Sequence, residues 1–229
     1  LIDAHLTSLN GGPRIGIFLM DQTGDAVAVE RTLRNLEEVN LYRSIAIVVC
    51  SAQPSAGIEN RASVVELDSG QGLAQTLNRH IADMESDWIM LMKAGSELLP
   101  SGLMLAAIEL PTLPAQCTAA YADEIVQVKG NEMGLLLRPD FNLDLLLSSP
   151  ASMSPHWLYR RDTLLEHGGF SSDSGDAFEL AYQLQLVEQY GLGCAGHISE
   201  PLLSASAAAS TDDTAQRNVI LRHLQARGF

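Results

Sequence analysis

Apolar runs and amphipathic segments alternate along the first hundred residues. Residues 14–20, RIGIFLM, form a continuous apolar run, which is typical of a strand buried on both faces of a sheet. Residues 45–50, IAIVVC, predict a second buried strand, and shorter apolar runs at 63–67 and 88–92 predict a third and a fourth. All four are short enough to be strands of an ordinary α/β domain.

Two amphipathic helices are predicted between these strands. Residues 25–40 place apolar side chains at helical spacing, with charged residues on the opposite face. Residues 72–84 repeat the pattern. The apolar stripes consist of Ala26, Val29, Leu33 and Leu36 in the first helix, and of Leu73, Leu77, Ile81 and Met84 in the second.

This alternation of strand and helix predicts a parallel sheet with crossover helices. Such sheets bind their ligands at the carboxyl ends of the strands. Those ends are Met20-Asp21, Cys50-Ser51 and Met92-Lys93, so any functional site is expected there.

The second half of the chain has a different pattern. Short apolar segments with turns between them predict an α+β arrangement with mixed or antiparallel pairing. The segment 204–210, SASAAAS, has only small side chains and no periodic pattern, and it is expected to be mobile. The predicted elements are a helix at 102–110, strands at 118–122, 125–128 and 134–138, and helices at 178–190 and 214–226.

Composition narrows the class of protein. The chain has 229 residues, of which 46% are hydrophobic and 18% charged, so it is globular. The net charge of −14 argues against nucleic acid as a partner, since binding phosphates requires Lys and Arg. Three irregularly spaced cysteines favour free thiols in a reducing compartment, and a cytoplasmic location is expected. No apolar run predicts a transmembrane segment, and the start at Leu1 suggests a domain excised from a larger protein.

Five motifs, in this order, carry a family resemblance. The segment 86–100, SDWIMLMKAGSELLP, resembles the signature strand of family 2 inverting glycosyltransferases of the GT-A type. The other motifs resemble those of the family members that build O-antigen and rhamnan-type surface polysaccharides. They are YADE at 121–124, RPDFNLDLLLS at 138–148, YRR with GGF within 159–170, and HLQARG at 223–228.

The resemblance implies a GT-A fold, in which a Rossmann-like, mostly parallel sheet is flanked by helices. Residues 1–229 would form one domain, with a nucleotide-binding half at 13–100 continuous with a smaller, mixed α+β acceptor half at 101–229. The implied chemistry is inverting transfer of a sugar from a nucleoside diphosphate sugar to a growing surface glycan.

The donor side departs from the family pattern. Cys50-Ser51 stands where the family has Asp-Asp or Asp-Asn, whose carboxylate contacts the nucleotide base. At the end of the fourth strand, Lys93-Ala94-Gly95-Ser96 replaces the aspartates that hold a divalent cation, so no metal and no other cofactor is expected. The remaining candidates for donor binding are Cys50, Lys93, Ser96 and Asn78. The alternative for Asn78 is a polar face residue of its helix, and the alternative for Lys93, a solvated surface residue, is the more common role of a lysine.

The catalytic base of the family is an aspartate that aligns with Ala177. Asp176 is one residue early, so it is either a displaced base or the N-cap of the following helix, and Glu179 is the second candidate. The candidates for acceptor binding are Asp123, Glu124 and Trp157. The first two are equally explained as turn residues, and Trp157 as a packing residue.

Two functional hypotheses follow. In the first, the domain is catalytically degenerate and serves as a structural or glycan-positioning module next to other domains of a surface-polysaccharide glycosyltransferase. In the second, it is an active, metal-independent transferase that binds a nucleotide sugar and a glycan acceptor. Lys93 would then stabilise the leaving diphosphate, Asp176 or Glu179 would be the base, and Asp123 would orient the acceptor. A fourth family motif is also missing, because the uncharged segment 203–206, LSAS, stands where the family has a His-x-Arg that grips phosphate. The intact core pattern beside these four missing charged functions favours the first hypothesis.

Overall fold

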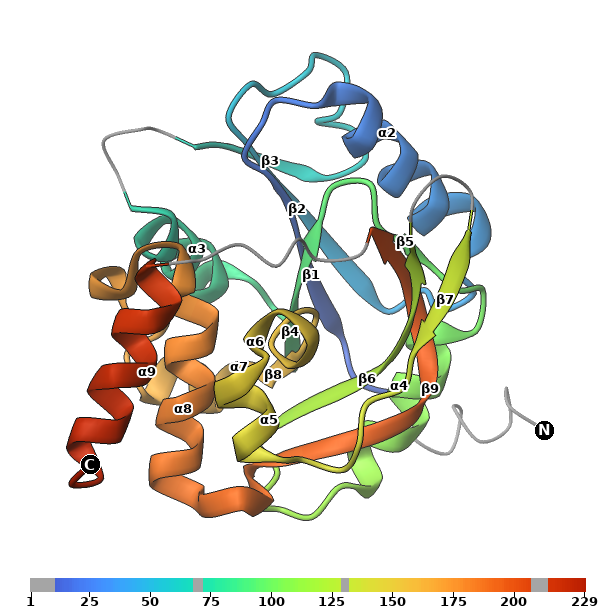
Figure 1. Ribbon diagram of the computed structural model, residues 1–229. Coiled ribbons are helices and arrows are strands. Elements are labelled where there is room, and N and C mark those ends of the chain that lie inside the picture. The colour runs from blue at the N-terminus through green and yellow to red at the C-terminus, as the bar shows by residue number, and fades with distance from the viewer. Residues whose placement is uncertain (1–10, 68–71, 129–131, 207–213) are drawn as a thin grey trace.

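One sheet runs through the whole fold (Figure 1). The computed structural model describes residues 11–67, 72–128, 132–206 and 214–229. Within them the sheet has nine strands in the order β3-β2-β1-β4-β8-β6-β9-β5, and β7 pairs with β6 beside this path. The strands are β1 (Ile15–Asp21), β2 (Ile45–Ser51), β3 (Ser63–Glu66), β4 (Trp88–Lys93), β5 (Glu97–Leu98), β6 (Ala119–Gln127), β7 (Met133–Leu136), β8 (Leu158–Arg160) and β9 (Ala195–Ser206).

The first four strands are parallel, as the alternation of strands and helices predicts. β1 lies between β2 and β4, and β2 pairs with β3. Met20 is in register with both Cys50 and Lys93, so the three strands end at the same edge of the sheet. That edge is where a parallel sheet places its ligand site.

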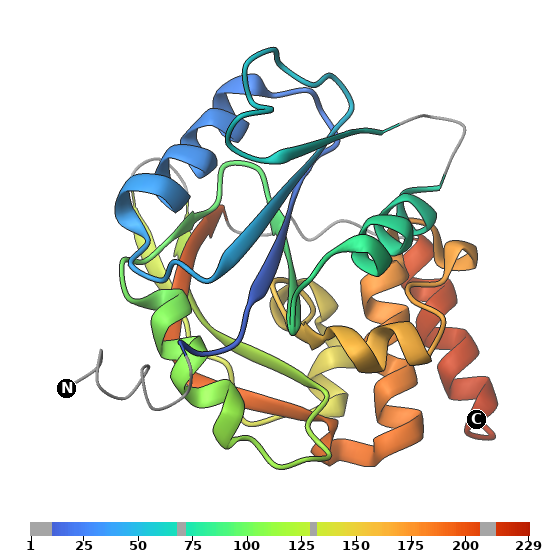
Figure 2. The same cartoon turned by 180° about the vertical axis from the view of Figure 1, so that it is seen from behind.

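The second half extends the same sheet with mixed pairing. β8 is antiparallel to both β4 and β6, and β9 is parallel to β6. The mixed pairing predicted for the second half is therefore confirmed. The sheet is curled and mostly parallel, and helices flank it on both faces (Figures 1 and 2).

Alternate side chains of each strand enter two separate cores. In β1, Phe18 packs with the core under α3 and α8, whereas Ile15, Ile17 and Leu19 pack with the core under α2 and α4. Figures 1 and 2 show α3, α8 and α9 on one side of the sheet and α2 and α4 on the other. The helices are α2 (Ala26–Arg34), α3 (Leu73–Asp83), α4 (Gly102–Glu109), α5 (Leu143–Ser148), α6 (Pro150–Met153), α7 (Arg161–Glu166), α8 (Phe178–Tyr190) and α9 (Thr214–Ala226).

The helix predicted at 25–40 is present in two parts. Asp25 caps α2 by accepting hydrogen bonds from the backbone N–H groups of Val27 and Ala28. The chain then continues as a π-helical segment at Asn35–Val39. The side chain of Asn35 is buried there and bonds both the N–H and the carbonyl oxygen of Leu98, which ties this segment to β5.

The two strands predicted at 118–122 and 125–128 are a single strand, β6. Its pairing with β9 shifts register on both sides of Asp123, so the chain contains an irregularity where a turn was expected. The interpretation of Asp123 and Glu124 as turn residues is wrong for the same reason. Both side chains are buried inside the strand, where Glu124 pairs with Arg138 and Asp123 lies 3.0 Å from Nε2 of His197.

Several short elements were not predicted. The segment 143–153 forms α5 and α6, and Asn142 caps α5 through a bond from the N–H of Leu145. Residues 204–206 belong to β9, although the small side chains suggested a mobile segment. Residues 207–210 of that segment and the predicted turn at 129–131 lie outside the described residues. In the described part of the chain, every helix is too short or too polar to cross a membrane.

The close packing of α4 on β9 gives a test of this architecture. A Cβ at Gly102 would overlap the backbone carbonyl oxygen of Leu202, which cannot move without disturbing the β5–β9 ladder. We expect Gly102→Ala to lower the free energy of unfolding by about 1–3 kcal/mol, as overpacking does, measured by urea unfolding. Gly193→Ala is the control, because its Cβ would make only ordinary contact with Gln116. Equal stabilities of the two variants would contradict this packing.

Candidate functional site

A cavity of about 470 Å³ opens at the carboxyl ends of β1 and β4. Its walls come from five parts of the chain that are distant in sequence: the β4–β5 loop, the outer half of β6 with β7, the loop before β8, the start of α8 and the end of β9. Its polar lining consists of Gln22, Lys93, Ser96, Glu124, Arg138, His156, Asp176, Glu179 and Ser206.

The β4–β5 loop forms one wall and is held by α2. The hydroxyl of Thr32 donates to the carbonyl oxygen of Ser96 at 2.7 Å and accepts from the N–H of Gly95 at 2.9 Å. Gly95 has a φ of 92°, a conformation that favours glycine. The loop is therefore fixed from behind, and Lys93 extends from its start as an exposed cation.

The opposite wall is built on a buried ion pair. The Nη1 atom of Arg138 lies 2.7 Å from Oε1 of Glu124, and both side chains are almost fully buried. The guanidinium also donates to the carbonyl oxygens of Ala122 and Ser152, while its Nη2 has no hydrogen-bond partner among the described residues. Burial raises the pKa of Glu124, but His156 and Arg138 outweigh it, and the pKa lies below its ordinary value.

His156 connects this ion pair to the cavity. Its Nδ1 lies 3.0 Å from Oε1 of Glu124, and the residue lines the cavity. It is the one residue other than glycine with a positive φ, 60°, in the described part of the chain. Strained backbone of this kind persists only where the surroundings hold it, and it is frequent at functional sites.

Glu179 lines the cavity and has a strongly raised pKa. The hydroxyl of Tyr159 donates to its carboxylate at 2.9 Å, and Gln183 donates to the same hydroxyl at 2.8 Å. Burial raises the pKa of Glu179 to about 7, although the bond from Tyr159 opposes the shift. A carboxyl group that titrates near neutral pH is suited to accept or release a proton.

The cavity brings together five of the nine predicted site residues. Lys93 and Ser96 lie on one wall, Glu124 on the other, and Asp176 and Glu179 at the start of α8. The alternative interpretation of Asp176 as the N-cap is wrong, because Ala177 occupies the N-cap of α8 without a side-chain bond.

The other four predicted residues lie outside the cavity, and their positions do not support contact with a ligand. Cys50 is fully buried in the core, which raises the pKa of its thiol to about 12. Asn78 uses its side-chain amide to bond the N–H and the carbonyl oxygen of Phe170. Asp123 accepts from the N–H of Arg138 and lies 3.0 Å from Nε2 of His197.

Trp157 is a packing residue, which was the alternative interpretation of it. The ring is fully buried and stacks on Tyr121 with a centroid distance of 5.0 Å. Its indole N–H donates to the carbonyl oxygen of Met153 at 2.6 Å. No face of the ring is available to a sugar.

Three residues that build the cavity or contact its lining were not candidates from the sequence: Arg138, His156 and Tyr159. A signal existed for Arg138 and Tyr159, because each begins one of the five motifs. His156 follows Pro155 in a short polar loop and carries no sequence signal, because its role depends on the distant Glu124.

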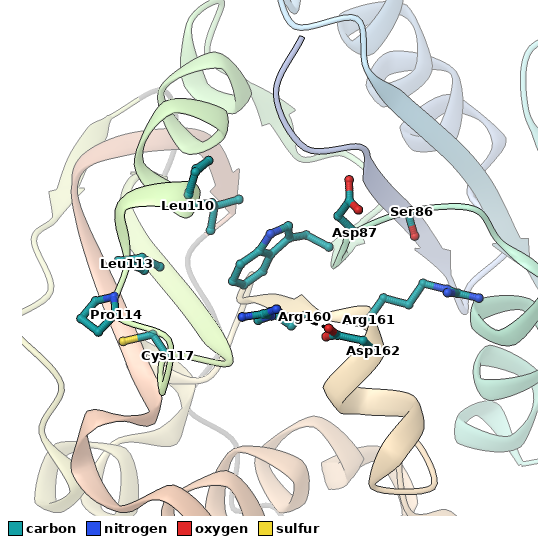
Figure 3. Close-up of a pocket in the computed structure, with 11 residues that line it drawn as sticks. Ser86, Asp87, Leu110, Leu113, Pro114, Cys117, Arg160, Arg161 and Asp162 are labelled. Carbon is teal, nitrogen blue, oxygen red and sulfur yellow. Dashed lines mark hydrogen bonds and ion pairs between the residues drawn. The ribbon is translucent and has the colours of Figure 1, made fainter. Parts of the chain in front are cut away.

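A second cavity, of about 460 Å³, lies at the opposite edge of the sheet (Figure 3). Its walls include the residues just before and at the start of β4, among them Asp87, together with Arg160 and Arg161. The arginine side chains there already have hydrogen-bond partners: Arg160 bonds the carboxylate of Asp162, and Arg161 donates to the carbonyl oxygens of Ile81 and Ala82. The amino-terminal edge of a parallel sheet is also not where ligands bind, so we assign the functional site to the first cavity.

The residues of the site do not fit a divalent cation. Within the described ranges, no three His, Cys, Asp or Glu side chains are grouped in a way that would hold a metal ion. At the end of β4 stands a cation, Lys93, where a hard metal needs oxygen ligands. Of the carboxylates, Glu124 is engaged by Arg138 and Glu179 accepts from Tyr159.

The sequence matches no protein-family model and no curated protein. Many solved structures nevertheless share its fold. TarS of S. aureus, residues 1–349 in complex with UDP, superposes with a TM-score of 0.63 at 12% identity, covering 92% of this chain and 70% of TarS.

Two further structures show the same likeness. The mannosyltransferase PcManGT from Pyrobaculum calidifontis, in complex with GDP-Man and Mn²⁺, has a TM-score of 0.58 at 17% identity, covering 93% of this chain and 62% of that one. Glucosyl-3-phosphoglycerate synthase from Mycobacterium tuberculosis, in complex with Mn²⁺, UDP and glucosyl-3-phosphoglycerate, has a TM-score of 0.59 at 13% identity, covering 99% and 84%. At these identities the likeness establishes the fold alone, and that fold is the GT-A glycosyltransferase fold.

The pKa of Glu179 gives a prediction for stability. Its carboxyl binds a proton more tightly in the folded protein, with a pKa of about 7, than in the unfolded chain, where the pKa is near 4.5. The stabilisation is therefore complete at acidic pH and is lost as the pH rises through 7. We expect the free energy of unfolding to fall relative to Glu179→Gln by up to about 3 kcal/mol between pH 5 and 8.

Urea unfolding at several pH values measures this difference. Glu66→Gln, which changes an exposed glutamate on β3, is the matched control and should leave the pH dependence of the wild type unchanged. A constant difference between wild type and Glu179→Gln across this range would mean that Glu179 has an ordinary pKa.

Proposed function

We propose that this chain is a glycosyltransferase-like domain of a surface-polysaccharide glycosyltransferase that binds and positions a glycan and does not transfer sugar itself. The observation that carries the proposal is the charge of the cavity. Its acceptor side has Glu124, His156, Asp176 and Glu179, whereas its donor side has Lys93 and the uncharged loop that follows.

This distribution favours a neutral, hydroxyl-rich ligand over a nucleoside diphosphate. The charge of Arg138 is compensated by Glu124 at 2.7 Å, which leaves Lys93 to face two phosphates in the absence of a metal. Asp176 and the ionised form of Glu179 would repel those phosphates. Carboxylate and imidazole groups, in contrast, accept and donate hydrogen bonds to sugar hydroxyls.

The resemblance of the five motifs supports the assignment to surface-polysaccharide synthesis. In such a protein the domain would act beside catalytic domains of the same chain and would hold the growing glycan for them. The fold contributes a concave site at the usual edge of the sheet, and the residues around it determine the ligand.

A thermal-shift panel tests the proposal. A ligand that binds only the folded state adds about 2.7 kcal/mol to the free energy of unfolding at a hundredfold excess over Kd. We expect neutral oligosaccharides to raise Tm, and UDP, dTDP, GDP and their sugars to leave it unchanged with or without manganese. A nucleotide shift, with or without manganese, or turnover of any nucleotide sugar, would contradict the proposal.

One observation favours a second function, that of an active, metal-independent inverting transferase. The pKa of Glu179, about 7, suits a general base. In this reaction the acceptor hydroxyl attacks the anomeric carbon, its proton passes to Glu179, and the bond from that carbon to the diphosphate oxygen breaks. Lys93 would stabilise the leaving diphosphate, Asp176 is the alternative base, and Asp123 would act only through the wall that it supports.

For this second function, Glu179→Gln should lower kcat by about 10²–10⁴-fold, the usual contribution of a general base. Tyr159→Phe removes a hydrogen bond that lowers the pKa of Glu179, so the rise of kcat/KM with pH should move to higher pH. Lys93→Ala should reduce the rate without moving that limb. The measurement is a pH–rate profile for each variant, and an unchanged rate in Glu179→Gln would exclude this role.

A further inference from the structure

Two side chains that line the first cavity can each carry a proton on an atom that is free for a ligand. His156 comes from the loop before β8, and Glu179 from the first turn of α8. Neither Nε2 of His156 nor Oε2 of Glu179 has a hydrogen-bond partner among the described residues, and both atoms are accessible. A ligand in the cavity can therefore exchange protons with both groups.

Glu124 determines which nitrogen of His156 carries the proton. Burial raises the pKa of Glu124, but His156 and Arg138 lower it further, so the carboxylate is ionised and can only accept a hydrogen bond. Nδ1 of His156 lies 3.0 Å from Oε1 of this carboxylate and must donate to it. The neutral imidazole therefore presents the lone pair of Nε2, which can accept a proton.

Tyr159 determines which oxygen of Glu179 carries the proton. The hydroxyl of Tyr159 donates to Oε1 at 2.9 Å, so Oε2 is the oxygen that is protonated in the neutral carboxyl group. Burial raises the pKa of Glu179 to about 7, which leaves the neutral form well populated near neutral pH. Glu179 can therefore donate a proton from an accessible atom.

One side-chain amide ties these two groups together. Nε2 of Gln183 donates to the hydroxyl of Tyr159 and to the carbonyl oxygen of Ser154, both at 2.8 Å. The hydroxyl of Tyr159 bonds Glu179, and Ser154 lies two residues before His156. Burial has the largest effect on the pKa of Glu179, but the charge of His156 also lowers it, so the two groups are neighbours in space.

We propose that the first cavity catalyses mutarotation, the interconversion of the α and β anomers of a free reducing sugar. Nε2 of His156 takes the proton of the anomeric hydroxyl, the bond between the anomeric carbon and the ring oxygen breaks, and Oε2 of Glu179 gives its proton to that oxygen. The carbonyl group of the open-chain aldehyde then rotates, and the ring closes by the reverse proton transfers. Both side chains return to their starting forms, so no second substrate is consumed.

This reaction requires only what the cavity provides. It needs one acid and one base at two neighbouring oxygens, and it has no diphosphate leaving group to stabilise. The carboxylate of Glu124 stabilises the imidazolium that forms, and the hydrogen bond from Tyr159 stabilises the ionised form of Glu179. Mutarotation at this site rests on the proposed function, since the cavity must first admit a sugar.

The exchange rate between the anomers of maltose and of chitobiose, measured by saturation-transfer NMR with the full chain, tests the proposal. We expect the protein to accelerate the exchange of at least one of them above its spontaneous rate. His156→Asn and Glu179→Gln should each reduce this acceleration by about 10²-fold or more, the usual contribution of a general acid or base. Asn tolerates the φ of 60° at this position, and Gln still accepts the bond from Tyr159, so both variants keep the fold.

The matched controls are His80→Asn and Glu66→Gln. His80 lies on α3 and Glu66 on β3, and neither lines the cavity, so both variants should keep the full acceleration. An acceleration that survives both His156→Asn and Glu179→Gln would come from another part of the protein and would overturn the proposal.

A thermal shift with the same two sugars separates mutarotation from the proposed function. A rise in Tm with exchange at the spontaneous rate would overturn mutarotation and leave glycan binding in place. Acceleration without a rise in Tm would support mutarotation and contradict a positioning role. If neither Tm nor the exchange rate changes at saturating sugar, both proposals fail.

Discussion

The buried ion pair between Glu124 and Arg138 is the interaction on which one wall of the candidate site, formed by β6, α6 and the loop before β8, depends. Removing one partner of such a pair leaves an uncompensated charge and typically costs about 3–5 kcal/mol. Here the pair also fixes geometry, because Arg138 bonds the carbonyl oxygens of Ala122 in β6 and Ser152 in α6, and Glu124 holds His156. One wall of the cavity is thus assembled around a single guanidinium group.

The opposite wall is rigid for a different reason. The Thr32 hydroxyl bonds backbone atoms of Gly95 and Ser96, and Gly95 has a φ of 92° that favours glycine, so both contacts fix the shape of the β4–β5 loop. The position of this wall is therefore set by backbone contacts between α2 and the loop. Lys93 supplies the one charged side chain that the segment 93–96 presents to the cavity.

The sequence predicts the parallel half of the sheet well, because buried strands and amphipathic helices have strong local patterns. It predicts the edge at which the site lies for the same reason, since Met20, Cys50 and Lys93 are in register. Local patterns do not predict the conformation of residues whose side chains are stabilised by contacts with distant segments. The sequence suggests a turn at Asp123 and Glu124 because the side chains that contact them in the strand, His197 and Arg138, come from other segments of the chain.

The same limit applies to the chemistry of Glu179. Its position at the start of α8 follows from the helical pattern, but its pKa depends on burial and on Tyr159, which no local pattern connects to it. A carboxyl group kept half-protonated near neutral pH lowers the negative charge of a cavity that otherwise contains Glu124 and Asp176. Such a carboxyl group can donate a hydrogen bond to one hydroxyl group and accept one from another. The burial that raises the pKa of Glu179 therefore also makes it a two-way hydrogen-bonding group in the wall of the cavity.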